Sequence, residues 1–524
     1  MVSRTSHARE IHRCALGRGT PLPAVTGDLL DVETLASLPD RHVTALREAL
    51  HAAAYDARIL GQAEGIAPRQ LDAVRLPLVQ AWLAAQPGPA AVLARLFAYR
   101  DLLGRDDVLR ALGPELGAAL EDCGVLAPVG ERVRSRLRLL PFGGIWIGSD
   151  DADARFDPVM GPGATTQELL RALPGVMPAR VLDVGCGAGS LALAAARSGA
   201  TAVTAVDLDP RAVALTEWNA RLNALTVTAK TGDLLAPIGD ARFDLVIAQP
   251  PFVPQPPDLR ATTYLHGGSR GDELALRLLS ELPGALAPGG RALILMDTAP
   301  LEGQLALDRI RAALPRVPLQ VSAVSARGHD RHQLALGYAA AADSTLGSAY
   351  ADAARRYLAH LEALGIESTR HVLLVLRKPV PDEPTWAISV EPRGAAPYDA
   401  TRLEHLEAGL ALATLAPEDL RACRVRPPEG SRLVQSHPLD GSEGALRFVC
   451  PGGRAPDQDL SDAAARLIEL ALQADSVAAL IDAYAEACED APERVEEAVL
   501  DFLRKALVSG LLEPYEDPDE DPSA

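Results

Sequence analysis

The feature that most constrains the fold is the alternation of short apolar segments with amphipathic helical patterns between residues 155 and 378. Apolar strands separated by helices need crossover connections, and these connections produce a parallel sheet that is covered by helices on both faces. We therefore predict an α/β fold with a doubly wound, seven-stranded, mostly parallel sheet. The predicted strands are RVLDVG, TAVTAVD, TVTAKTGD, FDLVIAQ, RALILMD, LQVSAV and HVLLVLRK.

The length of 524 residues leaves room for further domains, because a domain commonly holds roughly 100–200 residues. Residues 1–130 place apolar side chains at helical spacing between Pro and Gly breaks, and this pattern predicts a helical N-terminal domain. Residues 131–154 alternate in polarity around a Gly-Gly turn, which predicts a β-hairpin connector. The sheet domain is expected over 155–378.

The C-terminal region, 379–513, begins rich in Pro and Gly and ends in three short helical patterns. Ser461 and Ser476 are placed to cap the first two helices, and Pro492 to begin the third. A strand followed by three helices resembles the α+β winged-helix modules, including small ones that bind leader peptides in ribosomal peptide biosynthesis. Residues 514–524 are acidic and interrupted by Pro, so we expect a disordered tail.

The composition disfavours several classes of function. A formal net charge of −19 repels a phosphate backbone, so a nucleic-acid partner is disfavoured. No apolar run approaches the roughly 18 residues that span a bilayer, and the N-terminus lacks the apolar core of a signal peptide. The six cysteines have no paired spacing, which favours free thiols in a reducing compartment. We therefore expect a cytoplasmic protein with no membrane segment.

The segment RGHDRH (327–332) brings two histidines and an aspartate together, as some metal sites do. A metal site usually needs a third or fourth ligand that converges on the ion, and no further ligand follows at a fixed spacing. We predict a polar loop here and no metal.

The segment VLDVGCGAGS (181–190) runs from an apolar strand through three glycines into a helix. Gly185, Gly187 and Gly189 let the backbone approach a ligand at the turn, where the helix N-terminus offers unpaired N–H groups. Asp183, inside the strand, is expected to orient this loop or the charged amino group of the ligand.

Two further carboxylates end the next two strands. Asp207 follows the glycines by about 20 residues, where a carboxylate accepts hydrogen bonds from ribose hydroxyls. Asp233 ends the third strand, where it is placed to hold an adenine amino group. We expect Leu208 and Leu234, which follow these carboxylates, to contact the same ligand. This order and spacing predict a site for an adenosine-containing cofactor.

The fourth strand ends in FDLVIAQPPFVP (243–254), and the QPPF in it resembles the NPPY/NPPF motif of amino- and amide-methylating class I enzymes. That group includes the glutamine N5-methyltransferases of release factors and the "methyltransferase small" family. The segments GPGATTQELL (161–170) and YLHGGSRGDELALRLL (264–279) resemble the same group. The resemblance covers about 130–378. It implies a Rossmann-like methyltransferase fold and S-adenosyl-L-methionine (SAM) as the cofactor, bound by the residues named above.

In that group, the motif Asn and the backbone carbonyl after it accept hydrogen bonds from a planar substrate nitrogen, and the aromatic ring stacks on the substrate. The resemblance assigns these roles to Gln249, the Pro250 carbonyl and Phe252, with Gln249 also beside the cofactor. Gln is longer than Asn by one methylene, which moves the amide by about 1.5 Å. Tyr264 and His266 are expected to cover the substrate, the alternative being ordinary loop packing.

These observations predict a SAM-dependent methyltransferase that N-methylates a peptide or protein side chain, or a small amine or amide. Three alternatives stay open. A small-molecule natural-product methyltransferase would need a closed pocket, a nucleobase N-methyltransferase would need a basic groove, and a non-catalytic SAM-binding scaffold would account for Gln249. The C-terminal module is expected to recognise a substrate or partner, or else to pack or to form a homodimer.

Overall fold

The computed structural model describes residues 29–66, 72–150, 157–260, 262–300, 303–325, 328–342, 347–390, 399–436, 444–450 and 457–515. The predicted tail, 514–524, lies outside the described residues beyond Tyr515. The chain forms two units, Met1–Pro318 with Ser322–Lys378, and Leu319–Val321 with Pro379–Ala524. Our finer division of the first unit at residues 130 and 154 stays a prediction.

The central sheet contains all seven predicted strands, in the order β13-β11-β12-β10-β9-β6-β7-β8. Strands β6 to β10 form parallel pairs, while β12 runs antiparallel to β10. The sheet has eight strands where we predicted seven, because β13 extends it beside β11. A five-residue strand in a Pro-rich stretch alternates too briefly to be told from a loop. The strands are β6 (Arg180–Val184), β7 (Ala202–Asp207), β8 (Thr228–Thr231), β9 (Phe243–Ala248), β10 (Leu286–Thr298), β11 (Gln320–Ser325), β12 (Arg370–Arg377) and β13 (Trp386–Val390).

The strands in the middle of this sheet are buried almost continuously, as expected where helices cover both faces of a parallel sheet. Each helix between two strands therefore carries the chain back to the edge from which the next parallel strand starts. The carboxyl ends of β6, β7, β8 and β9 consequently face the same way, and the loops that follow them form the candidate site. The helices are α9 (Ala164–Ala172), α10 (Ser190–Arg197), α11 (Pro210–Asn223), α12 (Glu273–Ala285) and α13 (Ala306–Ala313).

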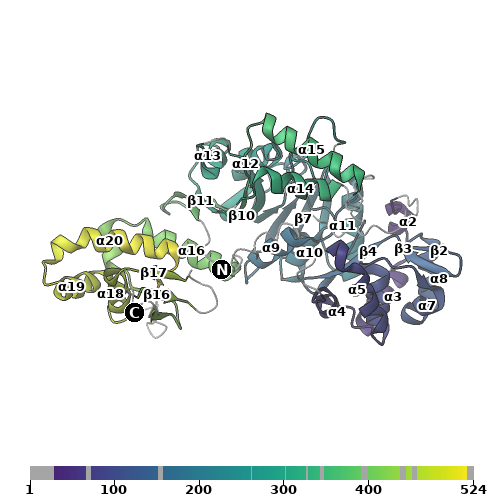
Figure 1. The fold of residues 1–524 in the computed structure, drawn as a ribbon, viewed down its shortest axis with the longest axis horizontal. Coiled ribbons are helices and arrows are strands. Elements are labelled where there is room, and N and C mark those ends of the chain that lie inside the picture. Colours follow the sequence, from purple (N-terminus) through teal and green to yellow (C-terminus); the bar gives the residue numbers. More distant parts are fainter. Residues whose placement is uncertain are drawn as a thin grey trace. The chain divides into compact units, whose positions relative to one another are not determined.

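Two further helices, α14 (Arg331–Ala342) and α15 (Ser348–Ala363), lie side by side between β11 and β12 (Figure 1). Their buried side chains, among them Tyr338 and Tyr357, pack with Val253, and Phe252 packs against the same cluster. This helical pair is therefore anchored on the segment that follows β9.

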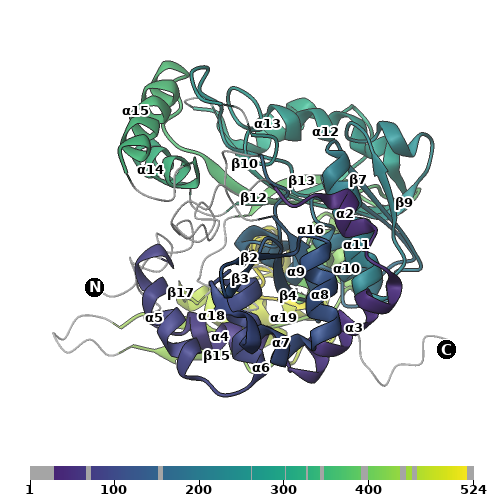
Figure 2. The ribbon, with the colours of Figure 1, turned by 90° about the vertical axis from the view of Figure 1, so that its right-hand side faces the viewer.

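The described part of residues 29–149 contains helices, a small sheet of order β1-β3-β2 and the hairpin β4–β5. Gly143 and Gly144 make the hairpin turn with φ of 56° and 81°, which glycine adopts without strain. Figure 2 shows α2 and α3 beside α11. The elements are α2 (Val32–Ala36), α3 (Asp40–Ala52), α4 (Ala57–Glu64), α5 (Asp72–Ala85), α6 (Pro89–Leu93), the π-helix Ala94–Ala98, β1 (Leu103–Gly104), α7 (Arg105–Leu112), α8 (Pro114–Asp122), β2 (Leu126–Val129), β3 (Arg132–Ser135), β4 (Arg138–Phe142) and β5 (Ile145–Ser149).

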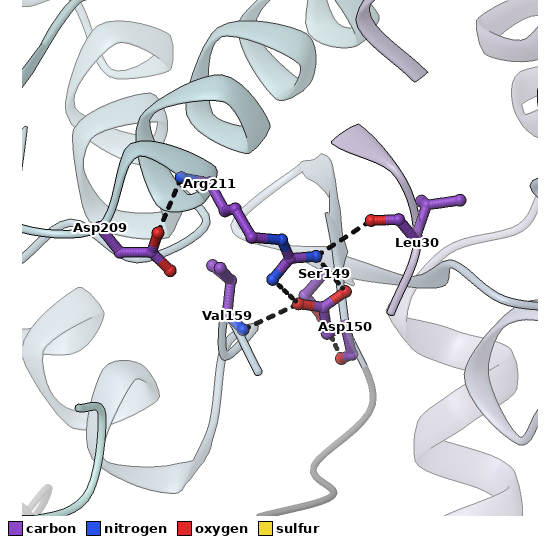
Figure 3. A network of polar contacts seen from close by, with 6 residues as sticks. All are labelled: Leu30, Ser149, Asp150, Val159, Asp209 and Arg211. Carbon is purple, nitrogen blue, oxygen red and sulfur yellow. Dashed lines mark hydrogen bonds and ion pairs between the residues drawn. The ribbon is translucent and has the colours of Figure 1, made fainter. Parts of the chain in front are cut away.

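One arginine connects three distant segments at the start of α11 (Figure 3). The Arg211 guanidinium donates to both oxygens of Asp150, at 2.8 and 3.2 Å, and to the Leu30 carbonyl at 3.0 Å. Asp150 also accepts a hydrogen bond from the Val159 amide at 2.9 Å. Asp150 is almost fully buried, so this pairing offsets the cost of burying its charge.

Two asparagines one turn apart on α11 hold the hairpin in place. The Asn219 carboxamide accepts from the Gly148 amide at 2.7 Å and donates to the Gly148 and Ala188 carbonyls at 2.8 and 2.9 Å. The Asn223 carboxamide pairs with both backbone groups of Trp146 in the same way. Asn219 therefore links the hairpin to the glycine loop through hydrogen bonds that are shielded from water.

The second unit contains a three-stranded antiparallel sheet, β15-β16-β17, followed by three helices. The Ser461 and Ser476 hydroxyls cap α18 and α19, and Pro492 is the first residue of α20, as the sequence predicts. The core includes Phe448 and Leu503. The elements are α16 (Ala400–Ala413), α17 (Pro417–Ala422), β14 (Val425–Arg426), β15 (Arg432–Gln435), β16 (Leu446–Val449), β17 (Gln458–Leu460), α18 (Asp462–Ala471), α19 (Val477–Ala487), α20 (Pro492–Ser509) and β18 (Glu513–Pro514).

Within the described ranges, no helix combines the length and apolar character needed to cross a bilayer. The same part of the chain holds no group of three or more His, Cys, Asp or Glu side chains arranged for a metal ion.

We expect Asn219→Ala to lower the free energy of unfolding by about 1–3 kcal/mol, because it leaves buried backbone groups without partners. Differential scanning calorimetry measures this change. The control is Glu217→Ala, an exposed position on the same helix, where we expect a change within about 0.5 kcal/mol. Equal effects of the two substitutions would contradict the role of Asn219.

Candidate active site

The glycine loop between β6 and α10 has the backbone shape that only glycine adopts freely. Gly185, Gly187 and Gly189 have φ of 72°, 54° and 79°. A Cβ atom on Gly189 would also lie 2.8 Å from the Thr216 side chain. The loop therefore brings bare backbone to the N-terminus of α10, the end of a helix that favours negatively charged groups.

Asp207, at the end of β7, lies directly against this loop. Its Oδ2 accepts a hydrogen bond from the Gly187 amide at 2.8 Å, and its Oδ1 accepts one from the Asp209 amide at 2.9 Å. Burial raises the pKa of Asp207, against the effect of these hydrogen bonds. The next residue, Leu208, is 59% exposed and offers an apolar surface beside the carboxylate.

Asp183 lies beneath the loop and is buried. Its Oδ2 accepts a hydrogen bond from the Ala192 amide in α10 at 2.9 Å. Burial raises the pKa of Asp183 to about 7, because few groups compensate the charge of the ionised carboxylate. The structure thus places Asp183 where it braces the helix that follows the glycine loop.

Asp233 and Leu234 follow β8, next to the end of β7. The Gly232 amide donates to the Asp207 carbonyl at 2.8 Å, which keeps the two strand ends together. The Asp233 carboxylate forms an exposed ion pair with Arg277 of α12, a partner that the sequence pattern did not indicate. Leu234 has a left-handed φ of 45°.

Gln249, the first residue of QPPF, is held by the first turn of α9. Its Nε2 donates to the Thr165 hydroxyl at 2.7 Å, and its Oε1 accepts from the Thr166 hydroxyl at 3.3 Å. An Asn side chain at this position would be about 1.5 Å shorter and could not keep the same contacts without a backbone shift. Both threonines lie in the segment GPGATTQELL, which resembles the family, but their pairing with Gln249 was not predicted from the sequence.

Phe252, the aromatic residue of QPPF, packs edge to face on His371, with ring centroids 6.3 Å apart. His371 is the second residue of β12, and it forms hydrogen bonds with Asp297 of β10 and Glu168 of α9. None of these three residues was predicted from the sequence. The ends of the segments RALILMD and HVLLVLRK contained the signal, because a charged residue and an imidazole terminate adjacent strands.

The segment after QPPF folds back on the motif. Val253 and His266 form a β-bridge, and a Cβ atom on Gly267 would collide with the Pro251 carbonyl. His266 Nδ1 accepts a hydrogen bond from the Thr262 amide at 3.0 Å. Its Nε2 lies 3.0 Å from the Tyr357 hydroxyl of α15. Burial lowers the pKa of His266, which favours the neutral ring with its proton on Nε2.

Tyr264 lies half-buried on the same segment. The QPPF end of the site therefore contacts α9 through Gln249 and α15 through His266. The remaining predicted residues gather at the ends of β6, β7 and β8.

Comparison with known proteins identifies this arrangement. The family described as "Methyltransferase small domain" matches residues 162–299, which contain the glycine loop, both strand-end carboxylates and QPPF. A protein of Methanocaldococcus jannaschii, described as a protein N5-glutamine methyltransferase, is 34% identical over 25% of this chain and 68% of its own length. The chain belongs to the class I SAM-dependent methyltransferases. It is an enzyme of the "methyltransferase small" group, and its cofactor is SAM.

Other relatives of this methyltransferase match over a smaller part of their length. A release factor glutamine methyltransferase of Geobacter sulfurreducens is 37% identical over 24% of this chain and 46% of its own. A ribosomal protein L11 methyltransferase of Thermotoga petrophila is 48% identical over 13% and 25%. The solved ribosomal protein L11 methylase of Lactobacillus delbrueckii subsp. bulgaricus aligns over 30% of this chain and 68% of its own, at 27% identity and a TM-score of 0.23.

We expect the contribution of Asp183 to the free energy of unfolding to fall as the pH rises from about 4 to about 7. The native carboxyl holds its proton up to its pKa of about 7, whereas the unfolded one releases it near 3.8, so deprotonation favours the unfolded state. Chemical denaturation of the wild type and of Asp183→Asn at several pH values measures this. The amide keeps the acceptor for Ala192 but does not titrate, so its stability curve should be flatter. Parallel curves would contradict the shift.

Proposed function

We propose that this methyltransferase transfers the methyl group of SAM to a side-chain nitrogen of a protein or peptide, and that the primary amide of glutamine is the preferred acceptor. The observation that supports this most is the carboxamide of Gln249, which α9 holds at the carboxyl end of β9, beside two prolines and an aromatic ring. The relatives described above act, by their descriptions, on glutamine or on ribosomal proteins.

The residues at the ends of β6, β7 and β8 fit SAM. Asp207 would accept hydrogen bonds from the ribose hydroxyls, because the residue is only half-buried and each carboxylate oxygen can accept a second hydrogen bond. Leu208 and Leu234 would flank the adenine. The Asp233 carboxylate would give up its ion pair with Arg277 and accept a hydrogen bond from the adenine amino group. The glycine loop would lie along the methionine part of the cofactor, with Asp183 beneath it.

SAM supplies a sulfonium-bound methyl group, so the protein needs to align the acceptor more than to activate a leaving group. The Pro250 carbonyl and Gln249 Oε1 would accept hydrogen bonds from the acceptor amide N–H groups, and Gln249 Nε2 could donate to the acceptor carbonyl. These contacts would hold the acceptor nitrogen towards the methyl carbon. Phe252 would stack on the amide plane. As the carbon–nitrogen bond forms and the carbon–sulfur bond breaks, the nitrogen loses one proton to solvent.

We further propose that residues 379–513 form a winged-helix-like domain that recognises the protein partner. The order of three antiparallel strands and three helices supports this reading. The exposed Val434 on strand β15 offers an apolar side chain at the edge of this sheet, where an extended peptide could add a strand. The alternative is packing or a homodimer. Because the chain carries a formal net charge of −19, nucleic acid is the least favoured acceptor. A cytoplasmic location fits a protein substrate.

The proposal is tested by incubating the full chain with SAM carrying a tritiated methyl group. The acceptors are release factor, ribosomal proteins, small amines and RNA from one bacterial lysate, separated before counting. We expect label in protein, at a glutamine that mass spectrometry locates. Label in small molecules or RNA would support the corresponding alternative, and no label in any fraction would support a non-catalytic scaffold.

Removing residues 400–524 should raise KM for the protein acceptor and leave SAM affinity intact.

We expect Gln249→Ala to lower kcat by about tenfold or more, or about 1.4 kcal/mol in the barrier, without changing SAM affinity. Gln249→Asn should not restore activity, since the shorter amide loses the Thr165 hydroxyl. Thr165→Val tests this link, because it removes the hydroxyl and keeps the side-chain size. Gln62→Ala, at an exposed position on α4, is the control. Full activity of Gln249→Ala would show that the carboxamide is dispensable.

We expect Asp207→Ala to weaken SAM binding about tenfold or more, as lost charge-assisted hydrogen bonds are worth roughly 1.5–3 kcal/mol. Isothermal calorimetry measures the dissociation constant. A SAM analogue without ribose hydroxyls separates the ribose contact from the support that Asp207 gives Gly187. The wild type should bind the analogue more weakly than it binds SAM. The Asp207→Ala variant should bind the analogue and SAM with equal affinity. Two fully additive losses would place the ribose elsewhere.

A further inference from the structure

The imidazole of His371 lies between two carboxylates from different elements. Its Nδ1 is 2.6 Å from Asp297 Oδ1 on β10, and its Nε2 is 3.4 Å from Glu168 Oε2 on α9. Asp297 and His371 are also direct partners in the β10–β12 ladder. The side chains are 11% exposed for Asp297, 19% for His371 and 27% for Glu168, so the cluster borders the surface without being open to it.

Both ring nitrogens of His371 are therefore donors. Burial by itself would lower the pKa of His371, but the hydrogen bonds and charges of Asp297 and Glu168 outweigh it and raise the pKa to about 10. The other titratable groups that face the cluster are Arg171, beside Glu168, and His329 and Tyr338, beside Asp297. The ring is consequently an imidazolium over the whole physiological range, held by a hydrogen bond on each side.

The cluster is connected to the QPPF motif by two routes. The first is direct, because the Phe252 ring packs on the His371 ring at an interplanar angle of 74°. The second passes through α9, whose first turn binds Gln249 through Thr165 while its next turn offers Glu168 to His371. One short helix thus supports both the amide and the aromatic ring of the motif.

We propose that His371 is a positioning residue of the methyl-transfer site, which Glu168 and Asp297 hold in one orientation so that it sets the plane of the Phe252 ring. A ring with both nitrogens bound cannot rotate without losing a hydrogen bond, so Phe252 packs against a fixed surface. The consequence for catalysis rests on the proposed role of Phe252 as the platform for the acceptor amide, whereas the control of the Phe252 ring does not.

Fluorine NMR of the full chain labelled with 4-fluorophenylalanine reports on this ring directly. The chain has 7 Phe residues, and Phe252→Leu identifies the resonance of position 252. We expect His371→Gln to shift or broaden this resonance and to leave most others in place. The matched control is His332→Gln, an exposed histidine, which should leave the resonance unchanged. An unchanged Phe252 resonance in His371→Gln, or an equal change in both variants, would overturn the proposal.

The charge of the cluster gives a second arm, which also covers a poorly folded His371→Gln. In the wild type the Phe252 resonance should stay constant between about pH 6 and 9, since His371 keeps its proton there. Glu168→Gln removes one carboxylate charge, lowers the pKa of His371 and should make the Phe252 resonance move with pH inside that window. A resonance that is insensitive to pH in both proteins, at any pH up to 9, would overturn the coupling.

The kinetic consequence is measured on the protein acceptor found by the labelling screen. His371→Gln and Glu168→Gln should lower kcat about fivefold or more and change the dissociation constant of SAM less than about twofold. A lower SAM affinity with unchanged kcat would overturn the positioning role. If no acceptor is labelled at all, the proposed function fails, while the fluorine spectra still decide whether His371 controls Phe252.

Discussion

The hydrogen bond from the Gly187 amide to the Asp207 carboxylate is the contact on which the glycine-loop end of the candidate site depends. It joins the loop after β6 to the end of β7, and the second oxygen of the same carboxylate begins the turn into α11. Because the loop glycines have left-handed backbone angles, they need such an external partner to stay in one conformation. The carboxylate is therefore a structural bridge as well as a candidate ligand.

The supports of this bridge come from far along the chain. Asn219 fastens the loop carbonyl of Ala188 to the hairpin, and Arg211 fastens the start of α11 to Asp150 and Leu30. The N-terminal helices and the hairpin thus do more than precede the sheet domain, because they brace the back of the glycine loop. A truncation that removed them to leave the sheet domain alone would also remove the hydrogen-bond partners of α11.

The sheet and the glycine loop could be predicted from the sequence because their signals are local: apolar strands of regular length, glycines at a turn and a carboxylate at a strand end. β13 could not, as five residues near prolines lack a distinguishable period. The contacts of Gln249 with α9 and the His371 cluster were also not predicted, although the polar residues at the ends of β10 and β12 gave part of the signal for the cluster. Their partners lie about 80 to 200 residues away, and only the folded sheet brings them together.

The pairing of Gln249 with Thr165 changes how this motif can be exchanged between enzymes. The QPPF motif does not hold its conformation alone, since the Gln249 side chain is bound by the Thr165 hydroxyl, which lies 84 residues earlier in the chain. Replacing QPPF with NPPY would put the shorter Asn at position 249, and the Thr165 hydroxyl would lose its hydrogen bond to the carboxamide. An exchange of the motif that keeps this hydrogen bond would therefore have to include the first turn of α9 together with the end of β9.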